Sequence, residues 1–277
     1  MQRTFASYCL VLAATLAASL AVGEPLQVAL FRADVTPPAG APLCDALCPP
    51  STGVNDPLSA RGIIFLSQDQ SPIVLVAVDW VGIGNDGNHA WRKALADACS
   101  TTIDRVCVHT LHQHDAPGCD FQAEEIAAGA DLAGRLFPVG FAREAIDRAA
   151  AAAKKSLAER SVVSHISYGS GAVSNVASNR RILGDDGKVK YMRLTACTDP
   201  VIRDQPVGLI DPLVRMVAFW NEDQPLAILT YYATHPQSYY RTGLVSADFV
   251  GMARDMAQRA EGAKLHIHFN GAGGNIG

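Results

Sequence analysis

The irregular order of β-rich and helical segments is the feature that most constrains the fold of this chain. Short runs rich in β-branched and aromatic residues predict strands at 27–31, 62–66, 73–78, 105–109, 162–168, 214–220, 226–232 and 265–269. Helical periodicity predicts helices at 88–98, 141–160 and 249–259, the last with Asp248 as its N-cap. Because strands and helices do not alternate regularly, a Rossmann fold or a barrel is disfavoured. We expect an α/β fold: a mixed β-sheet sandwich with helices packed on the outside.

Residues 1–23 have the pattern of a secretory signal peptide. One positive charge, on Arg3, precedes an apolar stretch at 8–20, and small residues close the segment. This stretch is short for a membrane span, and no later segment offers about eighteen uninterrupted apolar residues. We therefore expect a secreted or periplasmic protein, with one domain at 24–277.

Composition indicates an ordinary globular protein. Apolar residues make up 49% of the chain and charged residues 18%, and the net charge is −4. No basic patch stands out, so broad electrostatic binding to nucleic acid is disfavoured.

Six cysteines follow the predicted signal peptide: Cys44, Cys48, Cys99, Cys107, Cys119 and Cys197. An even number in an exported chain permits disulfides, although six cysteines allow about fifteen complete pairings. The sequence does not give the connectivity, although Cys44 and Cys48 flank a short turn-like stretch and could bond locally. The same pair could instead bind a metal, but a structural zinc site needs a second such pair, which the sequence lacks.

The sequence His112-Gln113-His114 lies where a predicted strand runs into a Pro/Gly loop. Side chains two apart on extended backbone point the same way, so both imidazoles could meet one metal ion. Asp115 could orient a ligand through its second ring nitrogen. The alternative is that these polar side chains bond only to nearby carbonyls.

A second histidine, His235, also ends an apolar strand, and Pro236 favours extended backbone there. It could equally be a buried structural residue. After the last predicted strand come Asn270, Gly273 and Gly274, whose Gly-rich turn could direct N–H groups at an anion or simply reverse the chain.

Three other patterns have weaker functional interpretations. His266 and His268 share one strand face, which other residues should cover. The sequence Gly87-Asn88-His89 is found in metallophosphoesterases, but their further D-x-H and G-H-x-H elements are missing, so His89 should begin a helix. Loops are predicted at 34–57 and 118–138, the first as an ordered loop over a site.

Taken in order, several motifs resemble the neutral/alkaline non-lysosomal ceramidase family. The matching segments span most of the chain: Phe31-Arg32-Ala33-Asp34-Val35-Thr36-Pro37-Pro38, Asp56-Pro57-Leu58-Ser59-Ala60-Arg61, Val76-Ala77-Val78-Asp79, His112-Gln113-His114-Asp115-Ala116-Pro117-Gly118, Ser178-Asn179-Arg180-Arg181, Ala233-Thr234-His235, Ser246-Ala247-Asp248 and the final Gly-rich turn.

The resemblance implies a zinc-dependent hydrolase that cleaves the amide bond of ceramide or a related N-acyl lipid. One zinc ion would be held by His112 and His235, while His114 and Arg180 would lie in the active site as catalytic residues. We assign substrate contacts to the Gly-rich turn. A lipid substrate also implies peripheral contact with a membrane.

The chain departs from the family pattern at the catalytic serine, whose position falls on Gly277. The family's remaining zinc ligands, a glutamate and a tyrosine, come from further downstream. We therefore expect a catalytic domain truncated at its C-terminal end, unless His114 or Asp115 substitutes as a ligand. Other interpretations are a catalytically degenerate exported protein that binds lipid or glycan, or a metal hydrolase that attacks another ester or amide by an activated water.

Overall fold

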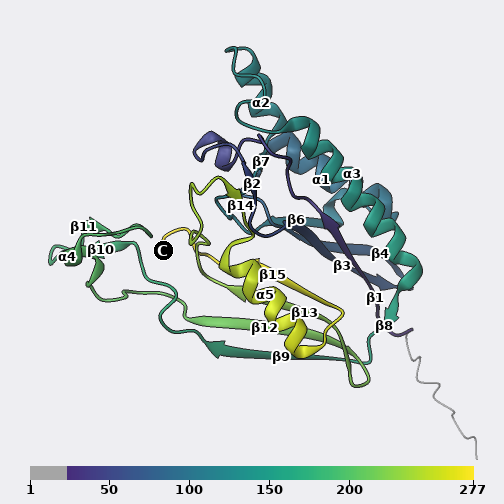
Figure 1. Cartoon of the computed structure of the whole chain (residues 1–277). Coiled ribbons are helices and arrows are strands. Elements are labelled where there is room, and N and C mark those ends of the chain that lie inside the picture. The colour runs from purple at the N-terminus through teal and green to yellow at the C-terminus, as the bar shows by residue number, and fades with distance from the viewer. Residues whose placement is uncertain (1–23) are drawn as a thin grey trace, which may run out of the picture.

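Two facing β-sheets form the centre of the computed structural model, which describes residues 24–277 (Figure 1). The predicted signal peptide at 1–23 lies outside the described residues. The first sheet has the strand order β6-β4-β3-β1-β8, and the second has the order β15-β13-β12-β9. The strands of the first sheet are β1 (Gln27–Asp34), β3 (Ser59–Ser67), β4 (Gln70–Val78), β6 (Val106–Thr110) and β8 (Ser161–Val162). Those of the second are β9 (His165–Ala172), β12 (Leu213–Asn221), β13 (Gln224–Tyr232) and β15 (Leu265–Asn270).

The core between the sheets follows from the alternation of side chains along each strand. Ile63 of β3 lies there with Leu229 of β13 and Ile267 of β15, all nearly inaccessible to water. The rings of Phe65 and Phe219 meet across the gap at 5.2 Å. Apolar burial on this face therefore holds the two sheets together.

Helices cover the outer faces, so the predicted mixed sandwich with helices outside is confirmed. Helices α1 (Asn85–Cys99) and α3 (Val139–Ser156) pack on the first sheet, where Trp80 and Trp91 meet edge to face at 5.4 Å. Ala149 and Ala153 are fully buried, so the alanine-rich helix approaches β1 closely. Helix α5 (Asp248–Glu261) packs along β15 of the second sheet.

Parallel strand pairs decide where the loops gather. β4 and β6 are parallel and joined through α1, and β13 and β15 are parallel and joined through α5. In such crossovers, the loops at the carboxyl ends of the strands form the usual place for a site. Here these are the loops that follow β4, β6, β13 and β15.

The structure corrects several sequence-based boundaries. The predicted loop 118–138 contains β7 (Gly118–Cys119), paired with β5 (Gly82–Ile83), and helix α2 (Phe121–Ala128). Asp120 caps α2 by accepting a hydrogen bond from the Ala123 N–H at 3.0 Å, a local signal that the weak apolar periodicity obscured. The strand predicted at 162–168 is divided between β8 and β9, which belong to different sheets.

Short elements complete the surface loops. The predicted loop 34–57 contains a single turn, η1 (Cys44–Ala46), and β2 (Gly53–Val54), which pairs with β14 (Leu244–Val245). A hairpin, β10 (Arg181–Leu183) and β11 (Val189–Met192), precedes the short helix α4 (Pro200–Arg203). Two further turns are η2 (Ile103–Arg105) and η3 (Leu157–Glu159).

The local disulfide that the sequence allows between Cys44 and Cys48 is not formed. Both are buried free thiols, as are Cys99 and Cys119, and Cys107 and Cys197 are also free. Burial, with the nearby Cys48 second, raises the pKa of Cys44 to about 12, which keeps this thiol protonated.

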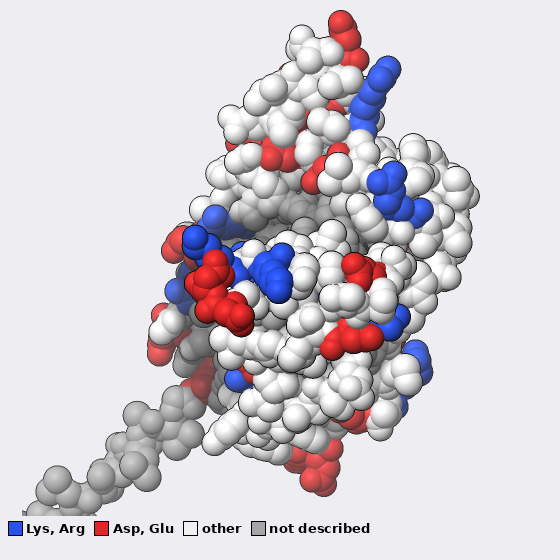
Figure 2. All heavy atoms as spheres, turned by 90° about the vertical axis from the view of Figure 1, so that its left-hand side faces the viewer, with Lys and Arg blue, Asp and Glu red and all other residues white. Residues whose placement is uncertain are grey.

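Within residues 24–277, no helix combines the length and apolar character needed to cross a bilayer. On the face shown in Figure 2, acidic and basic side chains are interspersed, and a hollow lies below the part of the molecule that carries α2.

Candidate metal centre

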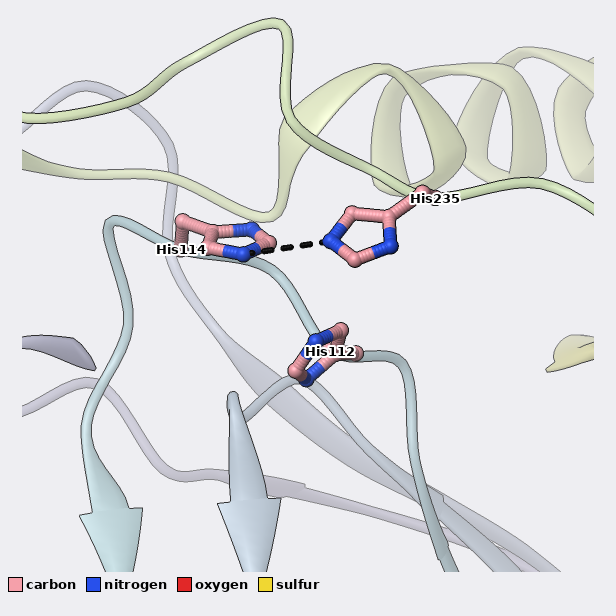
Figure 3. A group of neighbouring side chains, drawn as sticks. All are labelled: His112, His114 and His235. Atoms are coloured by element: carbon pink, nitrogen blue, oxygen red, sulfur yellow. Dashed lines mark hydrogen bonds between the residues drawn. The ribbon is translucent and has the colours of Figure 1, made fainter. Parts of the chain in front are cut away.

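Three histidines from two different loops meet at the carboxyl ends of the strands (Figure 3). Within the described part of the chain, His112, His114 and His235 form a group whose donor nitrogens all lie within 4.8 Å of one another. His114 is buried, His235 is half-buried and His112 is exposed. The group therefore opens to solvent on the side of His112, as an ion or a substrate requires.

His112 reaches the group through a sharp change of backbone direction. Strand β6 ends at Thr110, and His112 has a φ of 62°, in the left-handed region that non-glycine residues rarely adopt. The expected extended backbone across His112 and His114 is therefore wrong. Such strain costs about 1–3 kcal/mol and is found mainly at functional sites, where the surrounding structure maintains it. Here the His112 N–H donates to the Trp80 carbonyl at 3.0 Å.

The ring orientation of His112 and His114 is fixed by backbone carbonyls. His112 Nδ1 lies 2.6 Å from the Val81 oxygen, and His114 Nδ1 lies 3.0 Å from the Pro236 oxygen. A carbonyl only accepts, so each Nδ1 carries the proton and each Nε2 presents a lone pair. This arrangement is typical of metal-binding histidines.

His235 follows β13 and completes the group from the second sheet. Its Nε2 lies 3.2 Å from His114 Nε2. Since His114 Nε2 is the acceptor, His235 Nε2 donates in this contact. His235 would bind a metal at this nitrogen as the tautomer that carries its proton on Nδ1. The three donors fit a divalent transition metal such as zinc, which prefers imidazole nitrogen.

Asp115 does not orient a ligand, contrary to the sequence-based expectation. Its buried carboxylate accepts hydrogen bonds from the N–H groups of Arg241 and Thr242, at 2.9 and 3.1 Å, and from the Thr242 hydroxyl at 2.5 Å. It therefore ties the loop after His235 to the loop after β6. This use of its oxygens leaves it outside the group of metal donors.

Asp248 has a similar anchoring role at the start of α5. The structure begins the helix at Asp248 itself, with a φ of 57° and no side-chain cap from Ala247. Its carboxylate accepts from Ser238 N at 3.3 Å, Tyr239 N at 3.0 Å and Phe249 N at 2.6 Å. The start of α5 is thereby held to the loop that follows His235, and the N-cap predicted at Asp248 lies one residue earlier, at Ala247.

The surroundings keep two of the imidazoles neutral. Burial, followed by the charge of Arg180, lowers the pKa of His235 to about 3. Burial also lowers the pKa of His114, with smaller contributions from His112 and Arg180. Neutral imidazole is the form that binds a metal, so the site is prepared for one at neutral pH.

Arg180 lies near the histidines, and its charge contributes to the lowered pKa of both His114 and His235. Its Nη2 donates to Gln237 Oε1 at 2.9 Å, while its buried Nε has no partner within the described residues. Gly277 packs against it, because a Cβ at Gly277 would lie 2.9 Å from Arg180 Nε. Gly277, where the resemblance implies a serine, is thus next to the arginine and carries no side chain.

Two of the predicted substrate residues, Asn270 and Gly273, contact the loops that carry the histidines. Asn270 donates through Nδ2 to the Leu111 oxygen at 2.6 Å, which joins β15 to the loop that carries His112. A Cβ at Gly273 would lie 2.4 Å from the Thr234 oxygen, so this glycine lets the turn pack on the backbone next to His235. At Gly274 the same atom would meet nothing within 4 Å. Direct contact of these residues with a substrate stays a prediction.

Some residues near the centre were not expected from the sequence. The Tyr240 ring meets the His114 ring edge to face at 5.5 Å. The Gln237 side-chain oxygen accepts hydrogen bonds from the Arg180 guanidinium and from the Thr195 hydroxyl. Both follow His235 within five residues, so their nearness in sequence was the available signal. His89 lies in α1, as expected, and takes no part in the group.

Comparison with known proteins gives the fold. No family model and no curated protein sequence matches the chain. The solved structure of neutral ceramidase from Pseudomonas aeruginosa superposes on 91% of this chain with a TM-score of 0.66 at 17% sequence identity. The chain has the neutral ceramidase fold. A second structure, of a ceramidase complexed with C2, superposes on 91% of the chain with a TM-score of 0.62 at 16% identity. The chain spans 39% and 38% of the lengths of these two proteins, so the likeness is to part of each.

Proposed function

We propose that this chain is part of an exported, zinc-dependent hydrolase of the neutral ceramidase type, which cleaves the amide bond of ceramide or a related N-acyl lipid. The convergence of His112, His114 and His235 supports this proposal most directly, because it lies at the positions that the motif resemblance assigned. The shared fold supports it independently of sequence.

His112 and His235 are the proposed zinc ligands, one from each sheet. When bound, zinc would polarise the amide carbonyl and lower the pKa of a water molecule. The carbonyl contacts at Nδ1 keep His112 turned toward the centre before an ion arrives. The strained backbone at His112 then serves to place its imidazole at the metal centre.

His114 and Arg180 are proposed to act on the substrate. With its Nδ1 proton held by Pro236, His114 can accept a proton only at Nε2, so it serves as the base that takes a proton from the attacking nucleophile. Arg180, through its guanidinium, stabilises the negative charge that develops on the amide oxygen. Water supplies the hydroxyl of the released fatty acid and the hydrogen of the released amine.

Zinc analysis and an amide-hydrolysis assay test the proposal together. His112→Ala and His235→Ala should each lose bound zinc and the release of fatty acid from a fluorescent ceramide. His114→Ala should keep zinc and lose turnover; if it loses zinc instead, His114 is the third ligand. His89→Ala, an exposed histidine on α1, is the matched control and should change neither. Full hydrolytic activity in metal-free protein would refute the proposal.

A second candidate is a catalytically degenerate exported protein that binds lipid or glycan. Gly277 favours it, because the position beside Arg180 lacks the serine of the family. A protein that holds zinc and binds ceramide without releasing fatty acid would support this candidate. Release of fatty acid from another ester or amide alone would instead support a metal hydrolase of different substrate.

A further inference from the structure

Gln237 joins two segments of the chain that are distant from it in the sequence. Its side-chain oxygen Oε1 accepts a hydrogen bond from Arg180 Nη2 at 2.9 Å and another from the Thr195 hydroxyl at 3.0 Å. A guanidinium only donates, so the oxygen of the amide must face Arg180, and the two donors occupy both of its lone pairs. The side chain of Gln237 is therefore fixed in one orientation.

The backbone around Gln237 belongs to the metal centre. Gln237 lies two residues after His235, and the carbonyl of the intervening Pro236 lies 3.0 Å from His114 Nδ1. One short stretch of chain thus carries a proposed zinc ligand, orients the proposed base and binds the arginine.

The Arg180 side chain depends on Gln237 for its position. The Arg180 backbone is held separately, because its N–H donates to the Asn275 oxygen and its oxygen accepts from the Arg193 N–H, both at 2.8 Å. In the part of the chain that the structure describes, Gln237 Oε1 is the one acceptor bonded to the guanidinium, and Arg180 Nε has no partner. Loss of this acceptor would leave the guanidinium free to turn away from the histidines.

No carboxylate neutralises Arg180. Within residues 24–277 it takes part in no ion pair. Burial lowers the pKa of Arg180, whereas a neighbouring carboxylate would raise it. The charge of Arg180 helps to lower the pKa of both His235 and His114, so its field reaches the metal centre. A neutral amide oxygen thus holds the cation without cancelling its charge, as a carboxylate would do.

The arginine borders open space beside the histidines. Arg180, Gln237 and Tyr240 line a pocket of about 500 Å³. The Tyr240 ring also meets the His114 ring at 5.5 Å, so the pocket adjoins the metal centre. A substrate in this pocket therefore has the arginine and the proposed base as neighbours.

We infer that Gln237 is a positioning residue of the candidate centre, which holds the Arg180 guanidinium toward the substrate through a neutral acceptor and leaves its positive charge available. The role of Gln237 rests on the proposed function, in which Arg180 stabilises the charge that develops on the amide oxygen.

Kinetics of the zinc-loaded chain test this role, with a fluorescent ceramide as the substrate. Gln237→Met removes the acceptor at a similar side-chain volume. The guanidinium acts on charge that develops in the transition state, so kcat should fall at least about tenfold while KM changes by less than about twofold. Bound zinc should stay at the wild-type level, and Gln122→Met, at an exposed position of α2, should change neither. An unchanged kcat in Gln237→Met, or a loss of zinc equal to the loss of turnover, would overturn the inference.

Added guanidinium ion separates positioning from a merely structural role. Millimolar guanidinium chloride should restore part of the turnover of Arg180→Ala, because the Gln237 oxygen can hold the free ion where the side chain ended. The same salt should restore nothing in Arg180→Ala/Gln237→Met. Rescue that is equal in the two variants, or absent from both, would contradict the role of Gln237.

Nitrogen NMR of the Arg180 guanidinium reads the contact without any turnover. The hydrogen bond at Nη2 should slow rotation of the guanidinium about its Nε–Cζ bond, and Gln237→Met should make this rotation faster, with Arg180→Lys identifying the signal. A rotation that depends on Gln237 in a protein without hydrolytic activity would refute the proposed function and still support the positioning of Arg180. The same rotation rate in the wild type and in Gln237→Met would overturn the inference, whatever the activity.

Discussion

Removing the guanidinium of Arg254 should destabilise the whole domain. Arg254 and Asp79 form a bidentate ion pair, with side-chain exposures of 1% and 0%. Burial is the largest influence on the Asp79 carboxyl and opposes its ionisation, but the charge and hydrogen bonds of Arg254, the Ser59 N–H and the charge of Arg61 together outweigh it and lower its pKa. In Arg254→Met, only the Ser59 N–H and hydroxyl and a long contact from Gln113 remain for a buried carboxylate. Breaking a buried pair in this way costs about 3–5 kcal/mol.

Urea denaturation at pH 7, followed by circular dichroism, measures this loss. A cost of about 3–5 kcal/mol is a large share of the roughly 5–15 kcal/mol that stabilises an ordinary domain. Arg259→Met, at an exposed position of the same helix, should change the free energy of unfolding by less than about 0.5 kcal/mol. The double variant Asp79→Leu/Arg254→Met should recover much of the loss, because no charge is then buried alone. A cost below about 1 kcal/mol for Arg254→Met would refute the reasoning.

Three further outcomes are expected. Gly273→Ala places a methyl group against the Thr234 backbone and should weaken zinc binding by displacing His235. Gly274→Ala, where the methyl group meets nothing within 4 Å, should leave zinc binding unchanged. Equal zinc affinities of the two variants, measured by competition with a chelator, would contradict this. His266 and His268 have a lowered pKa in the folded state, so the unfolded chain binds more protons below pH 6.5. The free energy of unfolding should therefore fall as the pH drops from about 6.5 toward 4. His268→Gln should make this fall smaller, and an unchanged dependence on pH in the variant would argue against the role of His268. Asp120→Ala should cost about 1 kcal/mol in thermal unfolding through loss of the α2 cap, with Glu125→Ala, at an exposed position of the same helix, as the control.

The strand pattern was sufficient to predict the sandwich because most strands are buried on at least one face. The runs at 73–78 and 226–232 needed little context, since apolar β-branched residues there can only be placed in a core. Helix α2 escaped prediction because its alanines and glutamates form no clear apolar stripe, and a single cap by Asp120 starts it. Which sheet β8 and β9 join depends on partners far away in the sequence, which a local pattern does not contain.

The sequence was sufficient to identify the histidines of the candidate centre, but not to predict how they are arranged in space. His112 and His235 stand at strand ends, and this position is visible in the sequence. The left-handed turn at His112 depends on its N–H bonding to Trp80, a tertiary contact. Asp115 was expected near a ring nitrogen, yet the carbonyls of Val81 and Pro236 take that role, because the loop of Arg241 and Thr242 occupies the carboxylate.

His112 follows the edge strand of one sheet, and His235 follows an inner strand of the other. A metal ion held by both would therefore act as a crosslink between the two halves of the sandwich. Any ion bound only by the assembled pair stabilises the docked sheets by an amount that grows with the logarithm of its free concentration. The dependence of stability on zinc concentration would then measure how tightly the two sheets are docked. If the sheets separate, the ion is released before either sheet unfolds.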